Sequence, residues 1–240
     1  MKIKTGLIVS AVMLLTGCDE GRLYDDTPTV ADQEGGRVTV DVCVRNEDTW
    51  SDSYTLSIAG FEDGNDFALI SKNISPSLSD GTAHIEVTGI PAEVSTIALC
   101  ALDRLRRCVT TFATVEYNAA QGQTAGYDID FGLCDMSMAA TIQRDIFNTT
   151  CVQCHGGSNH SAAGLNLTAG NSFSELIGIA SVRDPERMRV VAGDSGESLL
   201  YDMLSGDLSS GWRYDHSVEV VRSERLELIR NWIDDGANPR

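Results

Sequence analysis

The sequence predicts a multi-domain exported chain in which an all-β sandwich is followed by an all-α domain of short helices. Three observations predict this. An apolar leader ends at a cysteine, residues 37–134 alternate apolar and polar side chains, and residues 135–240 show helical spacing with capping residues. The 240 residues are 42% hydrophobic, which is enough for one or two modest cores.

The charge balance excludes one class of partner. The chain has 18 Lys and Arg against 35 Asp and Glu, a formal net charge of −17. Nucleic-acid binding needs clustered cations, and the sequence has no basic domain of that kind. We therefore expect no nucleic-acid partner, and we expect an acidic surface that favours a partner with a basic docking face.

Residues 1–17 are predicted to be an export signal. Two lysines precede the apolar run Gly6–Leu14, which is too short to span a bilayer as a permanent helix. The Leu-Thr-Gly-Cys that follows at 15–18 resembles the lipobox of bacterial lipoproteins. That resemblance implies lipidation of Cys18 and a membrane anchor facing the periplasm or the cell surface. The alternative is an ordinary signal peptide with an incidental cysteine. Residues 18–36 are predicted to be an acidic, extended tether.

Residues 37–134 are predicted to form a β-sandwich. Val38, Val40, Val42 and Val44 alternate with polar residues, which is the pattern of a half-buried strand. Six similar runs follow, separated by Gly, Asp, Asn and Pro: Tyr54–Ile58, Phe67–Ser71, His84–Thr88, Val94–Leu102, Cys108–Tyr117 and Gly126–Phe131. About seven short strands at this spacing favour an immunoglobulin-like sandwich, with the topology left open.

Four cysteines fall within the predicted sandwich. In an exported chain disulfides are the default, and four cysteines allow three connectivities. We favour Cys100–Cys108 across the ends of one hairpin, with Cys43–Cys134 then joining the first strand to the exit of the last. A metal or redox site is the alternative, although the spacing gives no compact ligand cluster.

Residues 135–240 carry the chemistry. Cys151-Val152-Gln153-Cys154-His155 is the CxxCH pattern of c-type haem attachment. Two thiols at this spacing can both reach vinyl groups on one edge of a porphyrin, and the next residue can bind the iron through its imidazole. The alternatives are zinc with His160 as the candidate further ligand, a structural disulfide, or a redox dithiol, which lacks its usual βαβ setting.

Short helices are predicted around this motif. Met138–Phe147 leads into it, with apolar residues four apart. Residues 172–175 resemble a capping box that opens a second helix, and Ser195 is expected to cap a third that runs to Ser205. The last helix has Ser223 as its predicted N-cap and Gly236 past its end.

Residues from about 139 to 237 resemble the small monohaem c-type cytochrome domains attached to many exported bacterial proteins, including planctomycete-type cytochrome c domains. The matching pieces are Ile142–Phe147, CVQCHGG at 151–157, AGLNL at 163–167, VVAGDSGESLLYDML at 190–204 and IRNWIDDGA at 229–237. The resemblance implies an all-α cytochrome c-like fold, one haem c held covalently by Cys151 and Cys154, and His155 as the proximal ligand.

One feature of many of these domains is missing. They carry a Met-Pro pair shortly before the last helix that supplies the sixth iron ligand, whereas no Met follows Met203 here. His216 lies close to the expected position and is the candidate distal ligand, with Met203 in reserve. Asp215, Tyr214 or a backbone carbonyl would orient its other ring nitrogen. The alternative is a surface histidine.

These observations favour a lipid-anchored electron-transfer protein with one covalent haem and a redox partner protein. An enzyme is not expected, because the sequence shows no Ser/His/Asp signature, no phosphate-binding glycine loop and no HExxH motif. The alternative is a surface or periplasmic binding lipoprotein whose sandwich is the working domain and whose CxxCH is structural or zinc-binding. A haem-based sensor with an open iron site is a third hypothesis.

Overall fold

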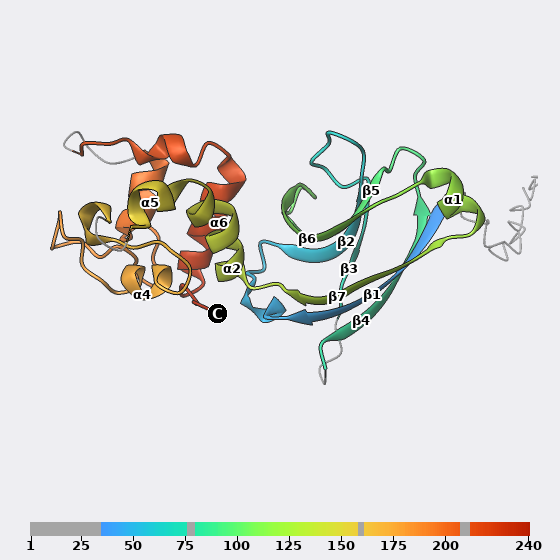
Figure 1. The fold of residues 1–240 in the computed structure, drawn as a ribbon, viewed down its shortest axis with the longest axis horizontal. Coiled ribbons are helices and arrows are strands. Elements are labelled where there is room, and N and C mark those ends of the chain that lie inside the picture. The colour runs from blue at the N-terminus through green and yellow to red at the C-terminus, as the bar shows by residue number, and fades with distance from the viewer. Residues whose placement is uncertain (1–34, 76–79, 158–160, 207–211) are drawn as a thin grey trace, which may run out of the picture. The chain divides into compact units, whose positions relative to one another are not determined.

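The computed structural model describes residues 35–75, 80–157, 161–206 and 212–240 (Figure 1). The predicted signal segment, the lipidation site Cys18 and most of the tether lie outside these residues, and so does His160. Within the described ranges, no helix has the length and apolar character needed to cross a membrane.

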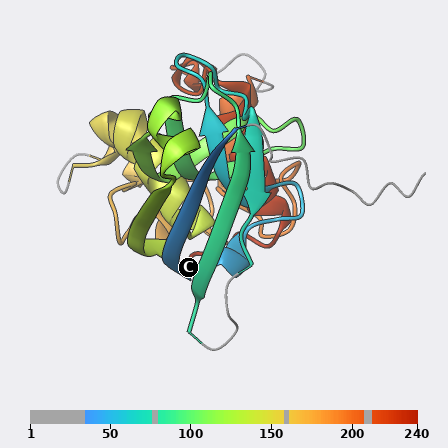
Figure 2. The same cartoon turned by 90° about the vertical axis from the view of Figure 1, so that its right-hand side faces the viewer.

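The strands of the described part form two sheets, with orders β4-β1-β7 and β3-β2-β5-β6. β1 runs antiparallel to β4 and parallel to β7, and Figure 2 shows β1 in blue alongside β4 in green. Every predicted strand is present, the third one displaced by a few residues. The bounds are β1 Gly36–Arg45, β2 Thr55–Phe61, β3 Ile70–Asn73, β4 Thr82–Ile90, β5 Thr96–Leu102, β6 Cys108–Glu116 and β7 Tyr127–Asp135.

The two sheets enclose a shared apolar core. The four valines of β1 that alternate with polar residues are all buried, which confirms the period-two pattern. They pack with inward-facing side chains of the other sheet, among them Ile58 of β2 and Leu99 of β5. Two short turns, η1 (Glu47–Thr49) and α1 (Ala119–Thr124), lie between strands.

The strand order differs from the predicted immunoglobulin-like arrangement. In that fold the first strand lies beside the second in a sheet of order A-B-E-D. Here β1 pairs with β4 and β7, while β2 pairs with β3 and β5. Alternation along a strand determines which face is buried but not which strand becomes its neighbour, so the pattern could predict the strands and not their order.

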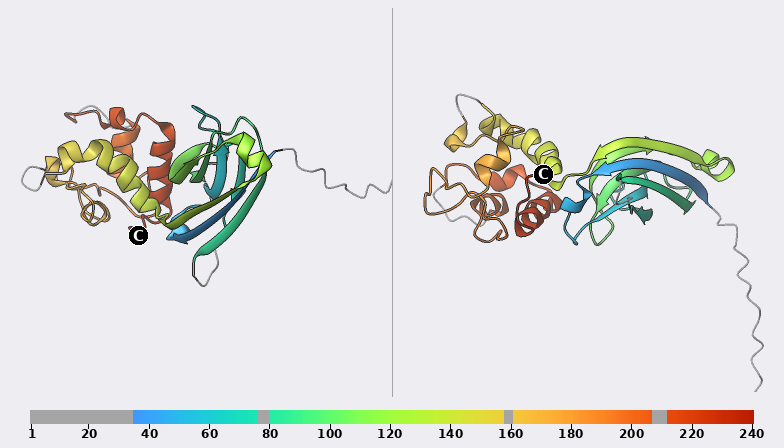
Figure 3. Two further views of the ribbon diagram at one scale, coloured as in Figure 1. Left: turned by 45° about the vertical axis from the view of Figure 1, so that its right-hand side comes forward. Right: turned by 90° about the horizontal axis from the view of Figure 1, so that it is seen from below.

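Most of the remaining helices are short. The exception is a longer helical run made of three consecutive segments. The segments α2 (Met138–Ile142), η2 (Gln143–Cys151) and α3 (Val152–His155) follow one another directly and form one helical run that ends at the CxxCH motif. Figure 3 shows this run as a continuous yellow-green to yellow coil. The middle piece has wider π-helical turns, a feature frequent at functional sites. The others are η3 Ala162–Gly164, α4 Ser172–Leu176, α5 Leu199–Ser205, η4 His216–Glu219 and α6 Ser223–Asp234.

The helix that leads into the motif begins at Met138 as predicted, whereas the caps predicted for the later helices are inaccurate. Glu175 does not close a capping box, because its carboxylate accepts a hydrogen bond from the backbone N–H of Asn166 instead. α5 begins at Leu199 rather than near Ser195, and Arg222 rather than Ser223 occupies the N-cap of α6. Gly236, past the end of α6, has a φ of 95°, which confirms the predicted left-handed stop.

The prediction of a distinct, all-α C-terminal domain of the cytochrome c type is wrong. The described residues belong to one compact unit, Gln33–Arg240, that is built mainly on the two sheets. The later part of the chain also contains isolated β-bridges, such as Ile177 with Val190 and Ala180 with Met188. Its apolar core includes partly buried residues of the sandwich region, namely Trp50, Tyr54 and Val109, so the helices share packing with the strands.

Polar contacts also join the helices to the strands. The carboxylate of Glu224 in α6 is 5% exposed and pairs with Arg107, which precedes β6, at 3.1 Å, and with Arg222. Arg222 reaches on to Asp66 at 3.0 Å. The guanidinium of Arg107, in the loop before β6, therefore contacts α6.

Substituting Glu224→Gln is expected to lower the free energy of unfolding by about 2 kcal/mol. Removing one partner of a fully buried ion pair costs about 3–5 kcal/mol, and both arginines here are partly exposed. Burial opposes the ionisation of Glu224, but hydrogen bonds from the backbone and from Arg222 outweigh it, so its pKa is lowered. Because the folded-state pKa lies below the unfolded one, this stabilisation is present above the ordinary glutamate range and is lost as pH falls.

Urea unfolding at several pH values checks the Glu224 prediction. The wild type and Glu224→Gln should differ at pH 7 and converge at acid pH. The control Glu227→Gln removes a partly exposed pair with Arg230 on the same helix and should change the free energy of unfolding by no more than about 0.5 kcal/mol. An equal difference at all pH values would contradict the ionic origin of the effect.

Candidate functional site

The long helical run presents the CxxCH motif at its end. Cys151 closes η2 and is half-buried against the apolar core of the later part of the chain, which includes Ile146 and Phe147 of the same run. Cys154 is exposed on α3, and His155 is the last residue of that helix, half-exposed. Both thiols therefore lie at the surface end of an element whose other end is fixed by core packing.

The loop after the motif holds His155 in place. The Nδ1 atom of His155 lies 3.0 Å from the carbonyl oxygen of Ala162, and the backbone N–H of Leu167 donates to the carbonyl of His155 at 2.6 Å. A carbonyl can only accept a hydrogen bond, so Nδ1 must carry the proton. The lone pair then lies on Nε2, which is the form of histidine that binds a metal.

His216 has the same arrangement on a separate element. It begins η4, where Asp215 is the N-cap and accepts a hydrogen bond from the backbone N–H of Ser217 at 3.0 Å. The Nδ1 atom of His216 lies 3.2 Å from the carbonyl oxygen of Tyr214, so its Nδ1 also carries a proton and the lone pair lies on Nε2. Of the three orienting groups that the sequence left open, the structure places a backbone carbonyl at this ring nitrogen.

The two imidazole rings face each other across a short gap. Their centroids are 6.2 Å apart and their planes differ by 31°. The fold thus brings together two histidines that are 61 positions apart in the sequence.

The surroundings also fit a flat, largely apolar group. Tyr214 packs its ring edge-on against His216 with centroids 5.0 Å apart, and it is 52% exposed. Val218, in the same short helix as His216, is 55% exposed. The carboxylate of Glu219 in η4 raises the pKa of the Cys151 thiol, so the end of η4 lies near that cysteine. Two thiols and two imidazoles are a donor set of the kind that haem c uses.

Burial affects two ionisable groups of the site. It lowers the pKa of His216, and the nearby His155 lowers it further. It raises the pKa of the Cys151 thiol, and the electrostatic effect of Glu219 adds to this. Both shifts favour the uncharged forms, a neutral imidazole and a protonated thiol.

The reserve ligand Met203 and the aromatic residue Trp212 lie on segments next to η4. Met203 is half-buried on α5. The guanidinium carbon of Arg183 lies 5.2 Å from the ring centroid of Trp212, in a cation–π arrangement.

No disulfide joins the six cysteines in the described residues. Cys100 and Cys108 form a hydrogen bond to each other, which raises the pKa of Cys100 well above its usual value and lowers that of Cys108. The Cys100–Cys108 disulfide stays a prediction, and the two thiols lie next to each other, as that bond would require. Cys43 faces outward and contacts the carbonyl of Asp80, whereas Cys134 is buried and contacts that of Phe131. The Cys43–Cys134 bond also stays a prediction, and it requires one side chain to turn to the other face.

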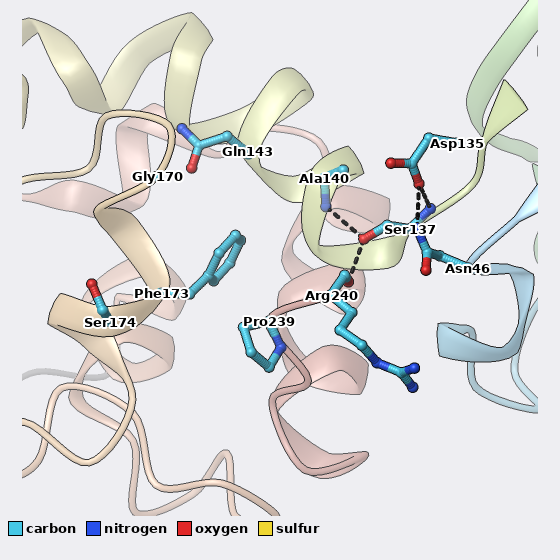
Figure 4. Close-up of a pocket in the computed structure, with 10 residues that line it drawn as sticks. All are labelled: Asn46, Asp135, Ser137, Ala140, Gln143, Gly170, Phe173, Ser174, Pro239 and Arg240. Atoms are coloured by element: carbon cyan, nitrogen blue, oxygen red, sulfur yellow. Dashed lines mark hydrogen bonds between the residues drawn. The ribbon is translucent and has the colours of Figure 1, made fainter.

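Two pockets lie away from the motif. One of about 630 Å³ lies between the ends of β1 and β7, α2, α4 and the last residues of the chain (Figure 4). Several of its polar groups are paired with one another: Asp135 accepts from Asn46 and from the backbone of Ser137, and Ser137 donates to the carbonyl of Arg240. A smaller one, of about 300 Å³, lies on the outer face of the first sheet. None of the lining residues of either belongs to CxxCH or η4.

Two features of the site were missed from the sequence. The carbonyl of Ala162 contacts His155, and the buried Arg189 donates to the carbonyl of Gly164 in the same loop. Both contacts depend on backbone groups of a loop with left-handed residues, which no pattern of residue types predicts. An arginine among Met188, Val190 and Val191 is the one signal that could have pointed to a buried cation.

In the described ranges, no group of three or more His, Cys, Asp and Glu is arranged to hold a metal ion.

No protein-family model matches the chain, and no curated protein matches it.

Proposed function

We propose that this chain is a lipid-anchored c-type cytochrome that transfers electrons through one haem attached to Cys151 and Cys154. The iron would be held between His155 and His216. The observation that supports this most is the facing pair of imidazoles, 6.2 Å apart, each with its Nδ1 hydrogen-bonded to a backbone carbonyl. When bound, haem supplies a one-electron couple between ferrous and ferric iron.

The chain's residues would bind and orient the group rather than perform chemistry on a substrate. Cys151 and Cys154 would fix it covalently, and the carbonyls of Ala162 and Tyr214 would hold the two imidazoles in the ligating tautomer. Two histidine ligands give a lower potential than a histidine with a methionine, because methionine ligation raises the potential of haem iron.

The acidic composition supports a redox partner with a basic docking face. With a formal net charge of −17, the chain would attract a redox protein that has a basic docking face, and the association would weaken as salt screens the attraction. Cys18, outside the described residues, would anchor the protein to a membrane through its lipid chains.

A redox titration of the full-length protein, purified from membranes of a host that matures c-type cytochromes, tests the proposed function. We expect one reversible one-electron transition in the visible spectrum, with about one haem per chain. The double variant Cys151→Ala and Cys154→Ala should lose covalent haem and the transition. Cys43→Ala, a control outside the motif, should keep both.

Two results would contradict the proposal. One is a wild-type protein without a visible-range redox transition, in a host where a control cytochrome matures. The other is a double cysteine variant that retains the transition unchanged. Zinc in the haem-free protein, measured by elemental analysis, would instead support the zinc-binding alternative.

A further inference from the structure

The loop that orients His155 has an unusual backbone. Ala163 and Gly164, the two residues after the accepting carbonyl of Ala162, have φ values of 54° and 60°. Glycine adopts this left-handed region freely, but an alanine there costs about 1–2 kcal/mol. Such a conformation persists only where surrounding contacts hold it, so something must fix this loop.

Arg189 makes those contacts. Its terminal nitrogens donate to the carbonyls of Gly164 at 3.1 Å and Ala163 at 3.5 Å, and to the carbonyl of Glu175 at 2.8 Å. The planar guanidinium can satisfy several carbonyls at once because its donors are rigidly spaced. The two left-handed residues that present the accepting carbonyl are therefore tied to one side chain.

The position of Arg189 is itself fixed. The residue is 8% exposed, its backbone N–H donates to the carbonyl of Ile179 at 2.8 Å, and its carbonyl accepts from Leu200 at 2.9 Å. Its closest carboxylate is that of Glu175, at 3.9 Å, and this carboxylate also holds the loop through the backbone of Asn166. A buried charge compensated mainly by carbonyl dipoles is costly unless all its hydrogen bonds are made, which makes the arrangement rigid.

We propose that Arg189 is a positioning residue for the proximal histidine: it holds the Ala162–Gly164 turn so that the carbonyl of Ala162 keeps His155 in the Nδ1-protonated tautomer. The role that this gives Arg189 at an iron centre rests on the proposed function, whereas the control of the tautomer is a property of the chain itself. Arg189 has no contact with the reacting group in this scheme and acts only through the turn.

The first arm of the test uses the full-length chain produced without haem attachment. Nitrogen-15 NMR above the histidine titration range reports which ring nitrogen of His155 carries the proton, with the signal assigned by its loss in His155→Gln. We expect the Nδ1-protonated form in the wild type and its replacement by the Nε2-protonated form in Arg189→Gln. Arg187→Gln is the matched control, since Arg187 lies on the same segment but pairs with Asp202.

A rescue variant separates positioning from general damage. Adding Ala163→Gly to Arg189→Gln removes the cost of the left-handed alanine, and it should restore part of the Nδ1-protonated signal. If Arg189→Gln does not fold, Arg189→Lys keeps the charge but cannot span both carbonyls, and it should lose part of the signal.

The second arm uses the haem-loaded protein. The low-spin electron paramagnetic resonance spectrum of the oxidised protein depends on the orientation of the axial imidazole, and it should shift and broaden in the Arg189 variants but not in Arg187→Gln. A wild-type tautomer in both Arg189 variants would overturn the inference, and so would an equal loss in Arg187→Gln. Failure to take up haem would overturn the proposed function alone, because the first arm needs no haem.

Discussion

Replacing His216 with alanine is expected to convert a protein that binds little carbon monoxide into one that binds it readily. The ring centroids of His216 and His155 lie 6.2 Å apart, and in the proposed function both histidines bind the haem iron. A site with both axial positions filled has no vacancy for a gas, whereas loss of the distal ligand opens one. The change should be large, from almost no spectral shift to a complete one under saturating gas.

The measurement is the visible difference spectrum of the reduced protein with and without carbon monoxide. His84→Ala is the control, because His84 is an exposed histidine of β4 paired with Asp41 at 2.6 Å. Met203→Ala tests the reserve ligand in the same assay. Ready binding by the wild type would show that His216 does not ligate, and a gas-sensing role would then replace electron transfer.

Replacing Trp232 with alanine is expected to lower the free energy of unfolding by about 3–5 kcal/mol, the range for deleting a large buried aromatic side chain. Trp232 in α6 is 1% exposed and packs on Phe173 with ring centroids 5.3 Å apart. Its Nε1–H donates to the carbonyl of Asn238 at 2.8 Å, and the substitution would leave that carbonyl without this donor.

Urea unfolding followed by far-ultraviolet circular dichroism checks this prediction. Trp212→Ala is the matched control, since Trp212 is half-exposed and makes a cation–π contact with Arg183 that is worth about 0.5–1 kcal/mol. Because the strands and helices belong to one compact unit, the whole signal should change in one transition. A strand signal that persists after the helices unfold would contradict the single unit.

Much of the local structure could be predicted from the sequence because its causes are local. Alternation of valines with polar residues identified β1, and apolar residues four apart identified the helix that carries the CxxCH motif. The order of strands could not be predicted, because pairing of β1 with β4 and β7 depends on contacts between distant segments. The packing of Trp50 and Tyr54 against the core of the helices could not be predicted either, because it also depends on contacts between distant segments.

The candidate site divides in a similar way. Residue types and spacing were enough to single out Cys151, Cys154, His155 and His216, and the structure brings the two histidines together. Spacing could not reveal which groups orient the rings, because both acceptors are backbone carbonyls. The contribution of Arg189 depends on a left-handed alanine 26 positions earlier, which only the folded backbone shows.

The measurement that tests the central claim most directly is a denaturing gel of the membrane-purified protein stained for haem peroxidase activity, with a pyridine haemochrome spectrum of the same sample. The account predicts that the haem stain stays with the denatured polypeptide and is lost in the Cys151→Ala and Cys154→Ala double variant. A wild-type band without haem, from a host in which a control cytochrome stains, would contradict covalent attachment at the motif and with it the electron-transfer function.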